Sequence, residues 1–307
     1  MILYKDDIMQ TNTTLIEFYD RIAQDSKQAL IQLISEAGQG KTSSMRSIMN
    51  HIKETQPDIE FVILDVSQAW YKKAPVKYRQ LVTRDKINAG LIDYTVTDCV
   101  YEMGSLSDEE RRWFTGKIVK HHYEQRYNAA LNGTLESYKY LVFMFEESNI
   151  YFGSYSFRRN DDASSVFQNF ASVGRNYRMR GFLIATVEMG EMAPSLRERT
   201  RKIYGRVISD RDLAVIRRKD KELADYLKSC PRYTFVYISD KPYGPVRIPD
   251  SSCGVPVDYV VSVSLNPIVE VKVVHGKWYY MACGALVVIG LLVGAFLFLV
   301  CVLTAVS

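Results

Sequence analysis

A glycine-rich stretch of the sequence, SEAGQGKTSS at positions 35–44, has the residue types that bind phosphate. The pattern G-x-x-x-x-G-K-[ST] is met at Gly40, Lys41 and Thr42, whereas Ser35 stands in place of the first glycine. Backbone N–H groups in such a loop wrap the phosphates, the lysine reaches the terminal phosphates, and the threonine hydroxyl binds Mg²⁺. The stretch therefore predicts a site for ATP and Mg²⁺, with Ser35 as a tolerated variation. The residues expected to contact the nucleotide are Gly38, Gln39, Gly40, Lys41, Thr42 and Ser43.

Two adjacent carboxylates, Glu146 and Glu147, follow the apolar run YLVFMF at positions 140–145. Ligands bind at the carboxyl ends of the strands in open α/β sheets, which is where this pair would lie. Glu146 is expected to hold Mg²⁺ through a water molecule. Glu147 is expected to orient or deprotonate the water that attacks the γ-phosphate. Together with Lys41, these residues predict hydrolysis of a nucleoside triphosphate.

An arginine-rich tract at positions 158–219 carries 14 basic and 7 acidic side chains, although the whole chain has a net charge of only +4. Arginines of this tract could stabilise phosphoryl-transfer charge across a subunit boundary, or they could follow the backbone of a nucleic acid. A solvated basic surface is a third interpretation.

Alternating strands and helices must position these residues. Apolar runs predict buried strands at 29–35, 59–67, 140–148 and 181–188, and helical spacing predicts a helix directly after the phosphate loop. A closing hairpin is expected from RYTFVYISD and GPVRIP near the end of this region. This alternation predicts an α/β fold with a mostly parallel central sheet, covered on both faces.

The chain divides into three predicted parts. Residues 1–249 form a P-loop ATPase domain, in which 71–137 is a helical insertion or an elaborated crossover. Residues 250–277 form a linker, a stalk or additional strands. Residues 278–306 form a transmembrane helix.

The predicted membrane span rests on the 26 residues at 281–306, which contain no charged side chain. As a helix they would be about 39 Å long at ~1.5 Å per residue, which exceeds the ~30 Å hydrocarbon core of a bilayer. Every Lys and Arg precedes the span. The positive-inside rule then predicts a single-pass, tail-anchored membrane protein with a cytoplasmic N-terminal domain. An internal membrane of a virion is the alternative location.

Four ordered motifs over roughly residues 29–210 resemble the FtsK/HerA superfamily of DNA-pumping ATPases. After the phosphate loop come FVILDVSQAWYK, containing Asp65, and YLVFMFEESNIYF. The fourth motif is ASVGRNYRMRGFLIATVEMGEMAPSLRER, where Gly-Arg-Asn-Tyr at 174–177 precedes a strand ending in Ala-Thr-Val. The resemblance implies a RecA-like fold, ATP and Mg²⁺ as cofactors, a homo-oligomeric ring such as a hexamer, and double-stranded DNA as the partner.

The resemblance also implies that Arg175 acts across the subunit boundary, with Arg178 and Arg197 as further candidates. Two positions depart from the family pattern. Glu146 stands where most members have Asp, and Val187 stands where a glutamine senses the γ-phosphate, so Thr186 or Glu188 would have to replace it.

The expected function is that of a membrane-anchored, ATP-hydrolysing DNA translocase, of the kind that packages the genome of a virus or a mobile element. One alternative is the virion assembly ATPase of filamentous phages, the zonula occludens toxin-like family. A membrane-tethered NTPase that remodels protein is another. A nucleotide-binding switch with little turnover stays open as well, although a GTPase switch would need an Asn-Lys-x-Asp motif, which the sequence lacks.

Overall fold

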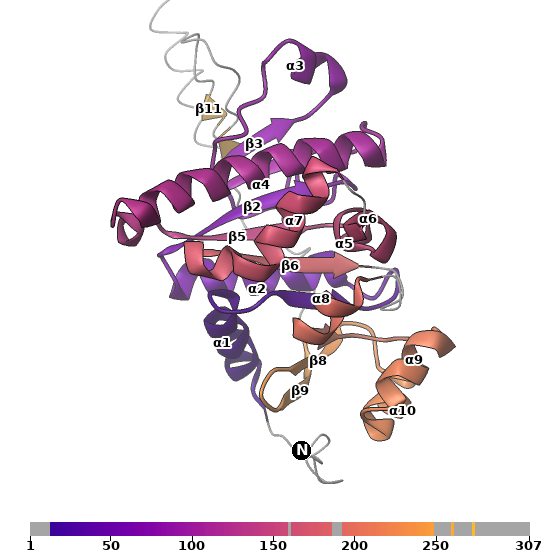
Figure 1. Cartoon of the computed structure of the whole chain (residues 1–307). Helices are drawn as coiled ribbons and strands as arrows, with labels where there is room; N and C mark the ends of the chain where they lie inside the picture. Colours follow the sequence, from indigo (N-terminus) through magenta and orange to yellow (C-terminus); the bar gives the residue numbers. More distant parts are fainter. Residues whose placement is uncertain (1–12, 159–160, 186–191, 249–258, 261–271, 274–307) are drawn as a thin grey trace, which may run out of the picture.

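The computed structural model describes residues 13–158, 161–185, 192–248, 259–260 and 272–273. A nine-stranded sheet forms its centre (Figure 1). The order of its strands is β3-β4-β2-β5-β6-β1-β7-β8-β9. The strands from β3 to β7 in this order are parallel, and β8 and β9 add an antiparallel hairpin at one edge. The strands are β1 (Ile31–Ile34), β2 (Ile59–Asp65), β3 (Tyr78–Leu81), β4 (Cys99–Glu102), β5 (Tyr140–Phe145), β6 (Met179–Ala185), β7 (Arg201–Tyr204), β8 (Thr234–Ile238) and β9 (Pro242–Arg247).

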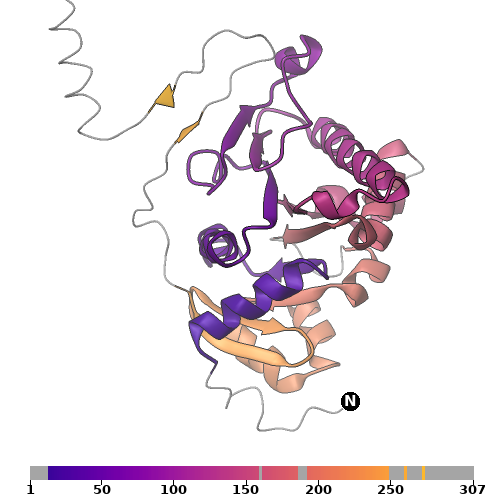
Figure 2. The same ribbon diagram turned by 90° about the vertical axis from the view of Figure 1, so that its left-hand side faces the viewer.

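Helices cover both faces of the sheet, and α2 and α4 lie on opposite sides of it (Figures 1 and 2). The α-helices are α1 (Leu15–Ser26), α2 (Lys41–Thr55), α3 (Arg84–Asn88), α4 (Asp108–Leu131), α5 (Asn149–Phe152), α6 (Ser154–Arg158), α7 (Asp162–Val173), α8 (Pro194–Arg199), α9 (Asp210–Arg217) and α10 (Lys221–Ser229). Short 3₁₀ helices occur at η1 (Leu135–Ser137) and η2 (Gly174–Tyr177), and β10 (Tyr259–Val260) pairs with β11 (Lys272–Val273) outside the main sheet.

Strand β5 shows why the sheet is buried on both faces. Successive side chains of a strand point to opposite faces. Val142 and Met144 join the core formed with α1 and α2, whereas Phe143 and Phe145 join the core formed with α4, α5 and α7. A central strand therefore has to be apolar at every position, and this explains the uninterrupted run YLVFMF.

The strands predicted from apolar runs are confirmed as β1, β2, β5 and β6, and the predicted closing hairpin is β8–β9. Strand β7 was not predicted. It consists of four residues, Arg-Lys-Ile-Tyr, of which the first two are half-exposed, so it has no apolar run. It nevertheless pairs with β1 in parallel and connects the hairpin to the rest of the sheet.

The segment 71–137 differs from a purely helical insertion. It contains the long helix α4, but β3 and β4 also extend the parallel sheet beyond β2. Buried Arg79 stabilises the loop before β3, because its guanidinium donates hydrogen bonds to the carbonyls of Tyr71, Ala74 and Val76 at 2.6–3.1 Å. The segment therefore contributes strands to the central sheet as well as a helix that covers one of its faces.

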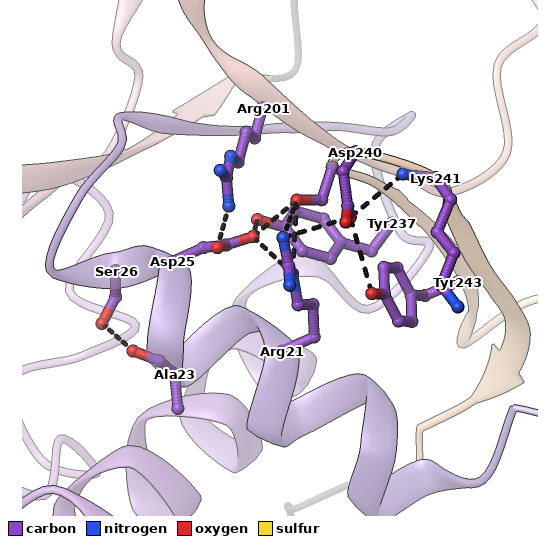
Figure 3. A network of polar contacts seen from close by, with 10 residues as sticks. Arg21, Ala23, Asp25, Ser26, Arg201, Tyr237, Asp240, Lys241 and Tyr243 are labelled. Carbon is purple, nitrogen blue, oxygen red and sulfur yellow. Dashed lines mark hydrogen bonds and ion pairs between the residues drawn. The ribbon is translucent and has the colours of Figure 1, made fainter.

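A polar network ties α1 to the β7 and β8–β9 edge of the sheet (Figure 3). Its centre is Asp25, which is only 3% exposed. The hydroxyls of Tyr237 and Ser239 donate to the Asp25 carboxylate at 2.7 and 2.8 Å, and Arg21 and Arg201 form ion pairs with it. Because a buried carboxylate needs such partners, the network holds the hairpin in one position relative to β7 and α1.

Among the described residues, no helix combines the length and the apolar character needed to cross a membrane. The predicted span at 278–306 lies outside those residues, as does most of the predicted linker at 250–277.

Candidate functional site

The phosphate loop connects β1 to α2, as expected from the sequence. Both glycines of the loop have positive φ angles, 73° at Gly38 and 90° at Gly40, a region that residues with a Cβ rarely adopt. Gly40 also precedes the first turn of α2, and its carbonyl accepts the first helical hydrogen bond from Ser44 N at 2.8 Å. The loop thus leads directly into a helix N-terminus, where N–H groups and the helix dipole favour a bound anion.

Ser35, the departure from the loop pattern, is accommodated by Gly205, which directly follows the neighbouring strand β7. Its side chain is 2% exposed, and Oγ lies 3.4 Å from the carbonyl oxygen of Arg206. A Cβ at Gly205 would approach Ser35 Oγ to 2.5 Å and the Phe235 ring to 2.9 Å. The space that a side chain at position 205 would need is therefore filled by the serine, and the loop keeps its path.

Lys41 is held over the loop by the loop's own backbone. Its Nζ donates to the carbonyls of Ser35 and Glu36 at 2.9 and 2.8 Å. Burial lowers the pKa of Lys41, and the nearby carboxylates of Glu147, Glu146 and Glu36 oppose that shift. The predicted lysine and both predicted glutamates therefore share one electrostatic site, although β6 lies between β1 and β5 in the sheet.

Glu146 is buried and is fixed by the turn that follows β2. Ser67 Oγ lies 2.8 and 2.9 Å from its two carboxylate oxygens, and the N–H groups of Val66 and Ser67 donate to Oε2 at 3.0 and 3.1 Å. Burial, together with the neighbouring Asp65, raises the pKa of Glu146 from its usual 4.5 to about 7. Sequence reasoning did not single out Ser67, whose only signal is its position two residues after Asp65.

Glu147 stands in an unusual backbone conformation, with φ at 48°. For a residue with a Cβ this left-handed conformation is costly, and such strain is concentrated at functional sites. The chain turns directly after β5, since the Glu147 carbonyl accepts from Ile150 N at 3.0 Å. The turn leaves Glu147 half-buried next to the buried Glu146, so the two acids have different environments.

The residues present fit a magnesium nucleotide. Thr42 and Ser43 lie in the first turn of α2, half-buried and buried, and Gln39 lies between the two loop glycines. Thr42 and Glu146 are the residues that would hold Mg²⁺, with Glu146 acting through water. The ion would offset the negative charge of the phosphates.

Arg175 lies far from this constellation within the chain. It belongs to η2, which leads into the amino end of β6, whereas the phosphate loop follows the carboxyl end of the parallel strand β1. The side chain is exposed at that opposite edge of the sheet. The fold therefore brings Lys41, Glu146 and Glu147 together but does not bring Arg175 to them, so a role at the phosphates requires a second copy of the chain.

The other predicted candidates divide into two groups. Arg178 is engaged within the chain, because its guanidinium pairs with Glu136 and donates to the carbonyl of Tyr138 at 2.8 Å. Thr186, Val187 and Glu188 lie outside the described residues, and so does the side chain of Arg197.

Neither a protein-family model nor a curated protein matches this sequence. Solved structures do match. The genome packaging NTPase B204 from Sulfolobus turreted icosahedral virus 2, in complex with AMPPCP, aligns with a TM-score of 0.50 and 12% identity over 72% of this chain and 99% of that chain. The same protein in complex with ATP-gammaS aligns with a TM-score of 0.51 and 12% identity, over 72% and 98% of the two chains.

At this level of identity the likeness establishes the fold. The mixed α/β architecture with a mostly parallel sheet fits the RecA-like P-loop fold predicted from the sequence.

Proposed function

We propose that this chain is an ATP-hydrolysing motor that translocates double-stranded DNA and serves to package a genome. The observation that carries the proposal is the convergence of Lys41, Glu146 and Glu147 beside a loop built for phosphate. Lys41 stands within electrostatic reach of both acids, which come from a strand two positions away in the sheet.

The residues divide the chemistry among themselves. The N–H groups of the loop and Lys41 bind and orient the triphosphate. Glu146, which is held in place by hydrogen bonds from the turn after β2, would bind Mg²⁺ through a water molecule. Glu147 takes the proton of the attacking water or orients that water. Buried Glu146 is a poor base for this role because Ser67 and the backbone already engage its oxygens. Half-buried Glu147 is the better choice.

Two observations support the proposal that the substrate is DNA and that the protein assembles into a ring. The fold is shared with a protein described as a genome packaging NTPase. In addition, Arg175 is exposed at the edge of the sheet opposite the phosphate loop, so its side chain is accessible to a neighbouring copy. A homo-oligomeric ring, such as a hexamer, would bring the arginine of one chain to the nucleotide of the next.

Membrane attachment belongs to the same proposal and rests on the uncharged residues 281–306. The anchor would hold the motor at a cell membrane, with the ATPase domain on the cytoplasmic side, or at an internal membrane of a virion.

The test is the rate of ATP hydrolysis by the full chain, in detergent, with and without double-stranded DNA. The Glu147→Gln variant is the control for contaminating ATPases. Turnover that rises with DNA and disappears in the variant supports the translocase. Glu147-dependent turnover that is indifferent to DNA contradicts DNA translocation and favours virion assembly or protein remodelling. If the wild-type chain binds ATP but does not hydrolyse it, the remaining function is that of a nucleotide-binding switch with little turnover.

A further inference from the structure

A tyrosine far along the chain lies directly against the phosphate loop. The turn between α10 and β8 contains Arg232 and Tyr233, nearly 200 residues after Gly40. Because β8 runs antiparallel to β7, its first residue lies near the carboxyl ends of the parallel strands. The phosphate loop lies at these same strand ends, because it follows the carboxyl end of β1.

The contact between the two segments is close and specific. A Cβ at Gly40 would lie 2.2 Å from both Cδ1 and Cε1 of Tyr233, so the edge of the ring occupies the space that the glycine leaves open. The Tyr233 N–H donates to the carbonyl of Gln39 at 3.3 Å, and the Tyr233 carbonyl accepts from Ile248 N at 2.8 Å. The tyrosine is thus bonded to the loop on one side and to the strand-end of β9 on the other.

Two features indicate that this position does more than fill space. Tyr233 has a φ of 62°, a conformation that costs free energy in a residue with a Cβ. Its ring is only half-buried, and the exposed Arg232 guanidinium lies 4.8 Å from the ring centroid. A flat aromatic ring and a flat cation are therefore held together at the rim of the loop.

We infer that Tyr233 and Arg232 form the stacking platform for the base of the nucleotide, an inference that rests on the proposed function of the phosphate loop. Glu146 and Glu147 come from β5, on one side of the loop, and this fixes the side at which the terminal phosphate is cleaved. The nucleoside then extends toward the other side, where β7 and β8 lie and where Tyr233 contacts Gly40.

Stacking on an aromatic ring has a chemical consequence. Every base has a π-face, so a platform of this kind tolerates different bases, and arginine adds a cation–π contribution. We expect ATP and GTP to bind with affinities within a few-fold of each other. Stacking of one base on an aromatic side chain contributes about 1–3 kcal/mol, so removing the ring should weaken ATP binding about 5- to 150-fold.

The experiment compares two ligands by calorimetry on the full chain, Mg·ATP and magnesium tripolyphosphate, which has the phosphates but no base. The variants are Tyr233→Ala, Tyr233→Phe and Tyr233→Leu. Tyr94→Ala, at another partly exposed tyrosine, is the matched control. We expect Tyr233→Ala and Tyr233→Leu to lose affinity for ATP but not for tripolyphosphate. Tyr233→Phe should bind both ligands like the wild type, because the ring is kept.

Three outcomes contradict the platform. The first is wild-type affinity of Tyr233→Leu for ATP, which would show that filling the space is sufficient. The second is an equal loss of both ligands in Tyr233→Ala, which would mean that the tyrosine only supports the loop. The third is a wild-type chain that binds tripolyphosphate as tightly as ATP. A wild-type chain that binds neither ligand refutes the proposed function itself, so failures of the two proposals are distinguishable.

Discussion

The phosphate loop has two sides of different character. On the carboxylate side, Glu146 and Glu147, which follow β5, bring negative charge to Lys41, and Asp65 at the end of β2 lies beside Glu146, so the effect of these residues is electrostatic. On the hairpin side, Gly205 follows β7 and Tyr233 precedes β8. These two residues contact the loop by steric packing, Gly205 against Ser35 and Tyr233 against Gly40. The charged residues at this site belong to recognisable sequence motifs. The packing around the loop depends instead on Gly205 and the ring of Tyr233, and neither residue belongs to such a motif.

Removing the loop lysine should have the largest effect. Lys41→Ala leaves the phosphates without their principal cation, so we expect ATP binding to fall below detection and hydrolysis to be lost. Binding of a fluorescent ATP analogue and phosphate release are the measurements. Lys120→Ala, a lysine with a 58% exposed side chain on α4, is the matched control and should behave like the wild type. Retained hydrolysis in Lys41→Ala would contradict the site.

On the carboxylate side, Glu147→Gln should separate binding from turnover. The amide keeps the shape but cannot take a proton, so we expect hydrolysis to fall on the order of 10²- to 10⁴-fold with ATP still bound. Glu124→Gln, on the exposed surface of α4, is the control. Normal turnover in Glu147→Gln would refute its role as the base.

On the hairpin side, we expect Gly205→Ala to lower the unfolding free energy without removing any group that takes part in ATP hydrolysis. A Cβ there meets Ser35 Oγ and the Phe235 ring at 2.5 and 2.9 Å, and such overpacking costs about 1–3 kcal/mol of unfolding free energy. Denaturant unfolding measures it. In the double variant Ser35→Gly with Gly205→Ala, part of the loss should return, because one of the two clashes is gone. Strictly additive effects would show that the two residues do not compete for this space.

The raised pKa of Glu146 predicts a pH dependence of stability on the carboxylate side. The folded state holds a proton up to about pH 7, whereas the unfolded chain loses it near 4.5. The folded state binds more protons between these values, so the unfolding free energy of the nucleotide-free protein should fall as pH rises through this window. A fall of about 1–3 kcal/mol is expected. Glu146→Gln should flatten this part of the profile, and an unchanged slope in the variant would contradict the assignment.

The smallest effect is expected from restoring the loop pattern. In Ser35→Gly the phosphate-binding N–H groups are unchanged, and the losses are the packing against Gly205 and the contact of Ser35 Oγ with the Arg206 carbonyl. We expect the KM for ATP to change by less than about 2-fold and the unfolding free energy to fall by about 1 kcal/mol. A large gain in activity would mean that the serine weakens the loop.

Much of the site could be predicted because its signals are local. The sequence GQGK predicts a phosphate loop that leads into a helix, and the structure has such a loop before α2, with positive φ angles at Gly38 and Gly40. The apolar run before Glu146 predicts a buried strand that ends at the ligand edge, which β5 does. The sequence also places Arg175 directly before a strand, and because β6 runs parallel to β1 this position lies at the edge of the sheet opposite the phosphate loop.

What the sequence by itself determined is the identity of the chemical groups and the elements that carry them. Glycine content, apolar runs and helical spacing act over a few residues and need no distant partner. Only the tertiary structure decided the strand order that inserts β6 between β1 and β5, the recruitment of the short strand β7, and the contact of Tyr233 with Gly40. These pairings join residues far apart in the chain, so they are set by the packing of the whole sheet, which local preferences do not specify.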